Sequence, residues 1–250
     1  MYEGMIAETV MYRGDGGEDI EAYVARPLGP GPFPSVVVLH HMPGWDEGTK
    51  EITRKFAHHG YNAIDPNLYY REGPGGEPDE VAAVARSQGG VPVDRLVGDA
   101  EGAAAYLRNL PTSTDRVGII GFCSGGRQVV IAASRSIAFD AAVDCWGGRV
   151  IADADQLTER QPVAPIDMID DLAAPLLGIF GNDDRSPSPE LVDQHEEALK
   201  QAGKTYEFHR YDGAGHGFFA TDRPGYRPVQ ATEAWGEVWQ WYERYLRTEG

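Results

Sequence analysis

Three residues whose side chains can together perform nucleophilic catalysis each follow a separate apolar run of this chain. Cys123 lies in GIIGFCSGG, between an apolar run and a segment compatible with a helix. A Gly-x-Ser-x-Gly sequence at such a junction is typical of a hydrolase nucleophile on a tight strand-to-helix turn, and here a thiol replaces the hydroxyl. The dipole of the following helix favours an anion, so it can lower the pKa of a thiol. The alternative is a small buried cysteine in a glycine-rich packing turn.

A thiol nucleophile needs a base, and the base needs an acid that orients it. His216 lies in YDGAGHGF, directly after an expected strand, and Asp183 and Asp184 follow the apolar run GIFG. The order Cys123, Asp184, His216 is the nucleophile–acid–histidine order of α/β-hydrolases. We therefore expect Cys123 to be the nucleophile, His216 the base and Asp184 the acid that orients His216.

The elements that must position these residues alternate between short apolar runs and helix-like stretches, a pattern typical of a mainly parallel sheet covered by helices on both faces. The 250 residues suffice for one large α/β domain, and we expect one domain over residues 1–250. The segment 71–94 is rich in Gly and Pro and poor in periodicity, and we expect it to be irregular, a surface excursion near a ligand site. The segment 149–171 is a polar stretch. Strands are expected over 21–27, 35–41, 61–67, 116–122, 141–147, 175–181 and 205–213, and helices over 46–60, 96–107, from 124, from 189 and over 233–246.

Composition argues against several classes of protein. The net charge of −17 disfavours nucleic acid as a partner and gives no support for binding to anionic membranes. No run approaches the length of a membrane helix, and residues 1–14 do not resemble a signal peptide, so we expect a cytoplasmic protein. Two cysteines without a CxxC spacing disfavour a zinc ribbon or a disulfide framework. His40 and His41 lack a partner at metal-ligand spacing, so no metal or other cofactor is expected.

The sequence resembles the dienelactone hydrolase family, the cysteine branch of the α/β-hydrolases. The resemblance runs from about residue 21 to the C-terminal helix and rests on GFCSGG, FGNDD, GAGHGF and HGYNAIDPNLYYREG. It implies an α/β-hydrolase fold and cleavage of small esters or lactones through a thioester intermediate. The sequence leaves open whether the protein is a monomer or a homodimer. Cys123 matches the family nucleophile, His216 its histidine, and Asp184 its acid, with Asp183 the less favoured choice.

The resemblance also implies an oxyanion hole made by the backbone N–H groups of Ser124 and Met42. Two positions depart from the family pattern. His41 stands where the family carries a glutamate that interacts with the resting thiol, and Ala220 stands where dienelactone-specific members carry an arginine that binds the substrate carboxylate. Arg223, three residues further on, is a candidate substitute for that arginine.

Aromatic residues near the expected strand ends are candidates for lining an apolar pocket, although ordinary packing is the competing interpretation of each. Two other functions stay open at this stage. One is a ligand-binding or redox-responsive protein that uses the Cys123 thiol without turnover. The other is a hydrolase of the same fold that acts on thioesters or phosphotriesters. The candidate substrate-binding residues are His41, Trp45, Tyr69, Tyr70, Trp146, Phe218 and Arg223.

Overall fold

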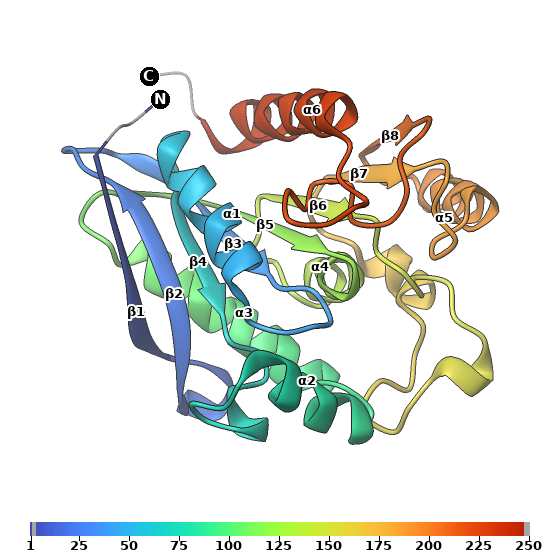
Figure 1. Ribbon diagram of the computed structural model, residues 1–250, viewed down its shortest axis with the longest axis horizontal. Coiled ribbons are helices and arrows are strands. Elements are labelled where there is room, and N and C mark those ends of the chain that lie inside the picture. The colour runs from blue at the N-terminus through green and yellow to red at the C-terminus, as the bar shows by residue number, and fades with distance from the viewer. Residues whose placement is uncertain (2–3, 248–250) are drawn as a thin grey trace.

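A computed structural model describes Met1 and residues 4–247 of the chain. An eight-stranded sheet runs through the molecule in the order β1-β2-β4-β3-β5-β6-β7-β8 (Figure 1). The six neighbouring strands β4, β3, β5, β6, β7 and β8 pair in parallel. Strands β1 and β2 extend one edge of the sheet with antiparallel pairing. The strands are β1 Met5–Arg13, β2 Asp19–Pro27, β3 Phe33–Leu39, β4 Asn62–Pro66, β5 Ser113–Phe122, β6 Ala141–Cys145, β7 Leu176–Gly181 and β8 Tyr206–Tyr211.

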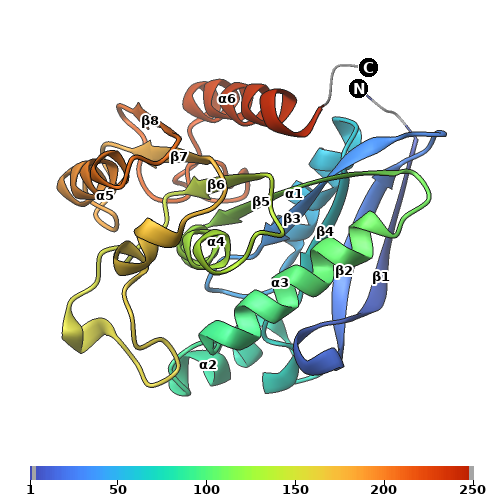
Figure 2. The same cartoon turned by 180° about the vertical axis from the view of Figure 1, so that it is seen from behind.

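Helices cover both faces of the sheet. Helices α3 and α4 pack on one face and α1 and α6 on the other, as the two opposite views show (Figures 1 and 2). None of the helices in the described part of the chain is long and apolar enough to cross a membrane. The helices are α1 Glu47–His58, α2 Pro78–Ser87, α3 Val93–Arg108, α4 Ser124–Arg135, α5 Pro189–Gln201 and α6 Pro228–Leu246, with short 3₁₀ turns η1 Asp15–Gly17, η2 Tyr70–Glu72, η3 Ala154–Gln156 and η4 Pro165–Asp171.

Strand β3 shows why the continuous apolar run predicts a central strand. All seven of its residues are buried. Val36 and Val38 belong to the core beneath α1 and α6, whereas Val37 and Leu39 belong to the core beneath α3 and α4. A strand buried on both faces carries apolar residues at every position rather than at alternate ones.

Two elements were not predicted. Strand β1 pairs with β2 along an edge of the sheet, and much of its length stays partly or fully exposed, so it offers no continuous apolar run. The Gly- and Pro-rich segment 71–94, expected to be irregular, contains α2, whose buried face is formed by Val81, Ala82 and Ala85. The glycines and prolines of this segment lie before and after α2, except Pro78, which is its first residue. Proline is tolerated there because the first amide of a helix needs no intrahelical acceptor.

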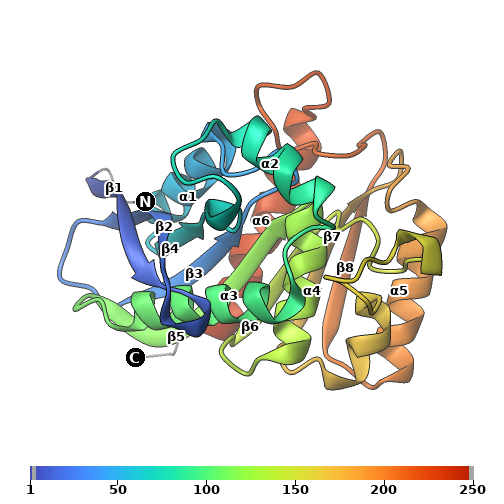
Figure 3. The ribbon, with the colours of Figure 1, turned by 90° about the horizontal axis from the view of Figure 1, so that it is seen from below.

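The long connection from β6 to β7 lies beside the connection between α2 and α3, below the sheet in Figure 1 and in the foreground of Figure 3. Hydrogen bonds join the two segments, from the Thr158 hydroxyl to the Gly89 carbonyl at 2.8 Å and from Arg160 to the Gly90 carbonyl at 3.2 Å. The polar stretch 149–171 contains the two 3₁₀ turns η3 and η4.

Candidate active site

Cys123 occupies a strained turn between β5 and α4. Its backbone has φ +57° and ψ −119°, a conformation that residues with a Cβ rarely adopt. Gly121 and Gly125 make the turn possible, because a Cβ at Gly121 would overlap the Gly125 carbonyl and one at Gly125 would overlap the Leu39 carbonyl. The half-buried Cys123 is therefore held at the N-terminus of α4 by the surrounding backbone.

Asp184 and His216 come together from the ends of two neighbouring strands. Asp184 follows β7, and its Oδ2 lies 2.8 Å from Nδ1 of His216, which follows β8. The other carboxylate oxygen accepts a hydrogen bond of 2.9 Å from the Ser186 amide. The side chain of Asp184 is only 3 % exposed whereas that of His216 is 40 % exposed, so the carboxylate is fixed beneath an imidazole that reaches the surface.

The pKa values of Cys123 and His216 move in opposite directions. Burial raises the pKa of the Cys123 thiol, but its hydrogen bond with His216 and the amides of Ser124 and Met42 outweigh burial and lower that pKa below its usual value. Burial lowers the pKa of His216, but its hydrogen bonds with Asp184 and Cys123 raise it to about 10. Both shifts favour a thiolate beside an imidazolium.

The turn after β3 carries His41 and Met42. The Met42 amide acts on the Cys123 sulfur, whereas the His41 side chain contacts Asp46. Nε2 of His41 lies 2.6 Å from Oδ2 of Asp46. Oδ1 of Asp46 accepts a 3.0 Å hydrogen bond from the Thr49 amide and so caps the N-terminus of α1. His41 therefore braces the turn that carries Met42, and its interaction is with Asp46.

The aromatic candidates divide into two groups around the thiol. Tyr69 is buried edge-on against His40, with ring centroids 4.7 Å apart, and it lines a small recess with the half-buried Trp45. On the other side, the ring of Trp146 lies 6.4 Å from that of His216. Phe218 is fully buried behind Trp146 with its ring centroid 5.0 Å away, so packing accounts for it rather than contact with a pocket.

Two other candidates lie further from these groups. Tyr70 is half-buried in η2 and packs on the core beneath α3. Arg223 is exposed in the loop between His216 and α6, where its amide donates to the Ala220 carbonyl.

Sequence reasoning missed two buried polar residues near the turn that carries Cys123. Asp144, in β6, is fully buried, and burial raises its pKa to about 7 while a 2.7 Å hydrogen bond from the Gly147 amide opposes that rise. Arg127, in the first turn of α4, is 8 % exposed. The sequence signal for Asp144 is an acidic residue inside the apolar run AAVDCW. A buried carboxyl group needs a hydrogen-bond donor, and the Gly147 amide just after this run supplies one.

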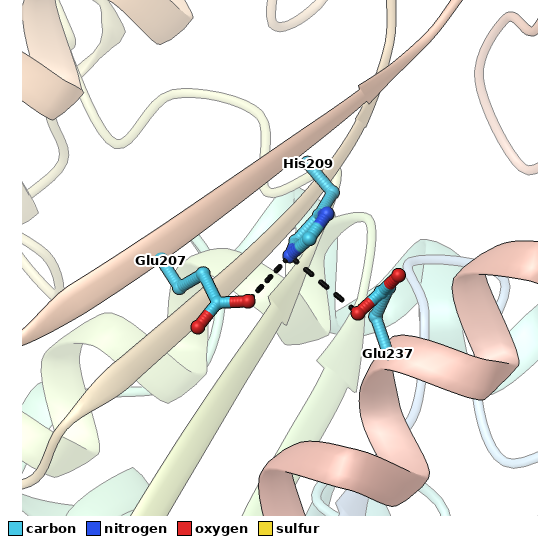
Figure 4. Close-up of side chains that lie close together, drawn as sticks. All are labelled: Glu207, His209 and Glu237. Carbon is cyan, nitrogen blue, oxygen red and sulfur yellow. Dashed lines mark hydrogen bonds and ion pairs between the residues drawn. The ribbon is translucent and has the colours of Figure 1, made fainter.

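One group of side chains in the described part of the chain lies close enough together to hold a metal ion: Glu207 and His209 of β8 and Glu237 of α6 (Figure 4). Nε2 of His209 lies 2.8 Å from Glu207 and 3.8 Å from Glu237, and Arg244 pairs with the other oxygen of Glu207. Charge pairing between β8 and α6 is sufficient to explain this arrangement.

Comparison with known proteins agrees with this architecture. The model of the dienelactone hydrolase family matches residues 20–246. The chain belongs to the dienelactone hydrolase family. It is 36 % identical over 228 residues to a protein of Methylorubrum extorquens named "Putative carboxymethylenebutenolidase", an alignment that covers 90 % of this chain and 77 % of that one. It is 33 % identical over 253 residues to a Salmonella typhimurium protein of the same name, covering 99 % and 91 % of the two chains.

A solved structure described as a "Putative Dienelactone Hydrolase" from Klebsiella pneumoniae superposes with a TM-score of 0.87 at 31 % identity, covering 97 % of this chain and all of that one. The expected α/β-hydrolase fold is thereby confirmed. This member of the dienelactone hydrolase family is accordingly an enzyme of the ester and lactone hydrolase class.

Proposed function

We propose that this dienelactone hydrolase family member cleaves small carboxylic esters or lactones through a thioester on Cys123, with His216 as acid and base and Asp184 as the residue that orients it. The observation that carries the proposal is the 2.8 Å contact between Asp184 and His216, and the opposite pKa shifts of His216 and Cys123 support their pairing. Nucleophile, base and orienting acid within hydrogen-bond reach of one another form the arrangement that covalent hydrolysis requires.

In the first half-reaction, the Cys123 thiolate attacks the carbonyl carbon and a C–S bond forms. The carbonyl oxygen becomes an oxyanion that the amides of Ser124 and Met42 stabilise, a role supported by their lowering of the Cys123 pKa. The C–O bond then breaks, and the leaving oxygen takes the proton from Nε2 of His216. A thioester and neutral His216 remain.

In the second half-reaction, His216 removes a proton from water as the water oxygen attacks the thioester carbon. Collapse of the new oxyanion breaks the C–S bond, releases the acid and restores the thiolate beside protonated His216. Asp184 holds one ring nitrogen throughout, so the other always faces the reacting atoms.

Activation of the thiol in this chain relies on His216 and the two backbone amides. His41 cannot act as a carboxylate acceptor for the thiol, and its Nε2 is hydrogen-bonded to Asp46. We propose that the pair of thiolate and imidazolium already exists before substrate binds, and that His41 positions Met42. Tyr69, Trp45 and Trp146 are the proposed apolar contacts of the substrate.

The test is intact-protein mass spectrometry during turnover of p-nitrophenyl acetate. We expect a transient acetyl adduct on Cys123 and steady release of nitrophenolate, with both lost in Cys123→Ala and with Cys145→Ala as the matched control. A stable adduct with a single equivalent of nitrophenolate would instead support a reactive thiol without turnover. Undiminished turnover by Cys123→Ala would refute the thioester mechanism.

A further inference from the structure

Asp144 is a buried acidic residue of β6 to which the proposed mechanism gives no role. Its side chain is fully buried. Oδ1 accepts a hydrogen bond of 2.7 Å from the Gly147 amide, and within the described residues Oδ2 has no partner. Burying a carboxyl group with one partner is costly, and the other residues of β6 are Ala, Val and Cys, so the carboxyl group is not needed for packing.

The hydrogen bond from Gly147 closes a turn directly after β6. Donor and acceptor are three residues apart, so the Asp144 side chain takes the part of a backbone carbonyl in holding this turn. Within the turn, Trp146 has φ +44°, a left-handed conformation that a bulky residue adopts only when its surroundings enforce it. The Trp146 amide also donates to the Ile179 carbonyl at 2.8 Å. Asp144 therefore stabilises the strained conformation of Trp146.

Oδ1 of Asp144 also lies against the first turn of α4, which follows the candidate nucleophile. A Cβ at Gly126 or at Gly147 would overlap this oxygen, so both backbones pack directly on the carboxyl group. The Cys145 carbonyl accepts a 3.0 Å hydrogen bond from the Cys123 amide. The turn after β6 is thus joined to the turn that carries the nucleophile.

The indole of Trp146 packs edge-on against the imidazole of His216. The ring centroids lie 6.4 Å apart and the ring planes meet at 67°. Phe218 and Phe219 contact the indole, with ring centroids 5.0 and 4.9 Å away, so its position is fixed from the side of the core. The contact with Asp184 fixes Nδ1 of His216 but leaves the ring free to tilt about that contact, and the packed indole limits the tilt.

We propose that Asp144 is a positioning residue for His216: it holds Trp146 in the left-handed turn from which the indole keeps the imidazole aligned with Cys123. The kinetic consequence rests on the proposed function, whereas the alignment itself does not. Misplacing a catalytic group by about 1 Å can cost about 10²-fold in rate. Alignment affects the chemical step, so its loss lowers kcat and leaves KM nearly unchanged.

The kinetic test uses Asp144→Ala and Asp144→Val, which both remove the acceptor of the Gly147 amide. Valine suits a buried strand, so the second variant retains the packing of β6. Among the variants that keep a cooperative thermal transition, we expect kcat for p-nitrophenyl acetate to fall about tenfold or more and KM to change less than about twofold. Asp144→Asn keeps an acceptor oxygen, and we expect it to restore most of kcat.

The matched control is Asp140→Ala, at the opposite end of β6. Oδ2 of Asp140 accepts a 2.8 Å hydrogen bond from the Val117 amide, so this variant also removes a carboxylate that binds a backbone amide. We expect kcat to stay at the wild-type value in Asp140→Ala, whatever happens to Tm. An equal loss of kcat in this control would reflect general destabilisation of β6 and would overturn the proposal.

Alkylation of Cys123 by iodoacetamide tests the alignment without turnover. We expect the pH profile of Asp144→Ala and Asp144→Val to shift toward that of a free cysteine, and that of Asp144→Asn to resemble the wild type. If the profile shifts but the wild type does not turn over the ester, the thioester mechanism fails and the positioning role stands.

Two results would overturn the positioning role. One is a folded Asp144→Ala or Asp144→Val with wild-type kcat and a wild-type alkylation profile. The other is a loss in Asp144→Asn as large as that in Asp144→Ala, because the effect would then belong to the charge of Asp144 and not to the turn that it holds.

Discussion

The contact between His41 and Asp46 can be tested quantitatively. Burial by itself would raise the pKa of Asp46, but the hydrogen bond and charge of His41, together with the hydrogen bonds from Thr49, lower it from 3.8 to about 2. A depression of roughly two pKa units corresponds to about 2–3 kcal/mol of stability. The Asp46 side chain is 26 % exposed, so solvent screening reduces our expectation to about 1–2 kcal/mol.

The informative variant is Asp46→Asn, because asparagine still caps α1 through the Thr49 amide but carries no charge. We expect the free energy of unfolding near neutral pH to fall by about 1–2 kcal/mol. Asp46→Ala is expected to cost about 1 kcal/mol more, since it also removes the cap. Urea denaturation of the three proteins measures both differences.

The contribution of Asp46 to the free energy of unfolding should depend on pH in one direction. The native pKa of Asp46 is depressed, so its contribution is fully present above the unfolded value and is lost as pH falls from about 4 toward 2. The difference between the wild type and Asp46→Asn should therefore shrink as acid is added within the range in which the native state persists. A His41→Gln, Asp46→Asn double-mutant cycle should attribute most of the difference to the pair. A difference that is absent near neutral pH, or that does not change with acid, would refute this account.

Three further outcomes follow from the site. Alkylation of Cys123 by iodoacetamide should stay fast below the ordinary thiol pKa and decline only as pH falls through its lowered value, whereas His216→Gln should restore the dependence of a free cysteine; identical profiles would contradict the ion pair. Asp184→Asn should lower kcat by about 10²–10⁴ with little change in Tm, and a change in KM alone would argue against an orienting role. Gly125→Ala should destabilise the native state by about 2 kcal/mol or more in urea unfolding, because its Cβ would overlap the Leu39 carbonyl, and an unchanged unfolding midpoint would argue against that overlap.

The sequence alone predicts most strands and helices along the chain and predicts that the three candidate residues follow the ends of separate strands. The carboxyl ends of parallel strands meet at one edge of a sheet, so residues that follow separate apolar runs are brought together whatever the loops do. The 2.8 Å contact of Asp184 with His216 is the outcome expected on that reasoning. Strand β3 was equally predictable, since its apolar residues carry the burial pattern locally.

The tertiary structure decides features that depend on segments far apart in the chain. Nothing local indicates that His41 turns to Asp46, that Phe218 lies behind Trp146, or that Arg127 is buried beneath the loop after β6. Strand β1 is determined by the free edge of β2 rather than by its own hydrophobic pattern. Backbone periodicity is encoded over a few neighbouring residues, whereas the partner of a polar side chain depends on which distant elements pack together.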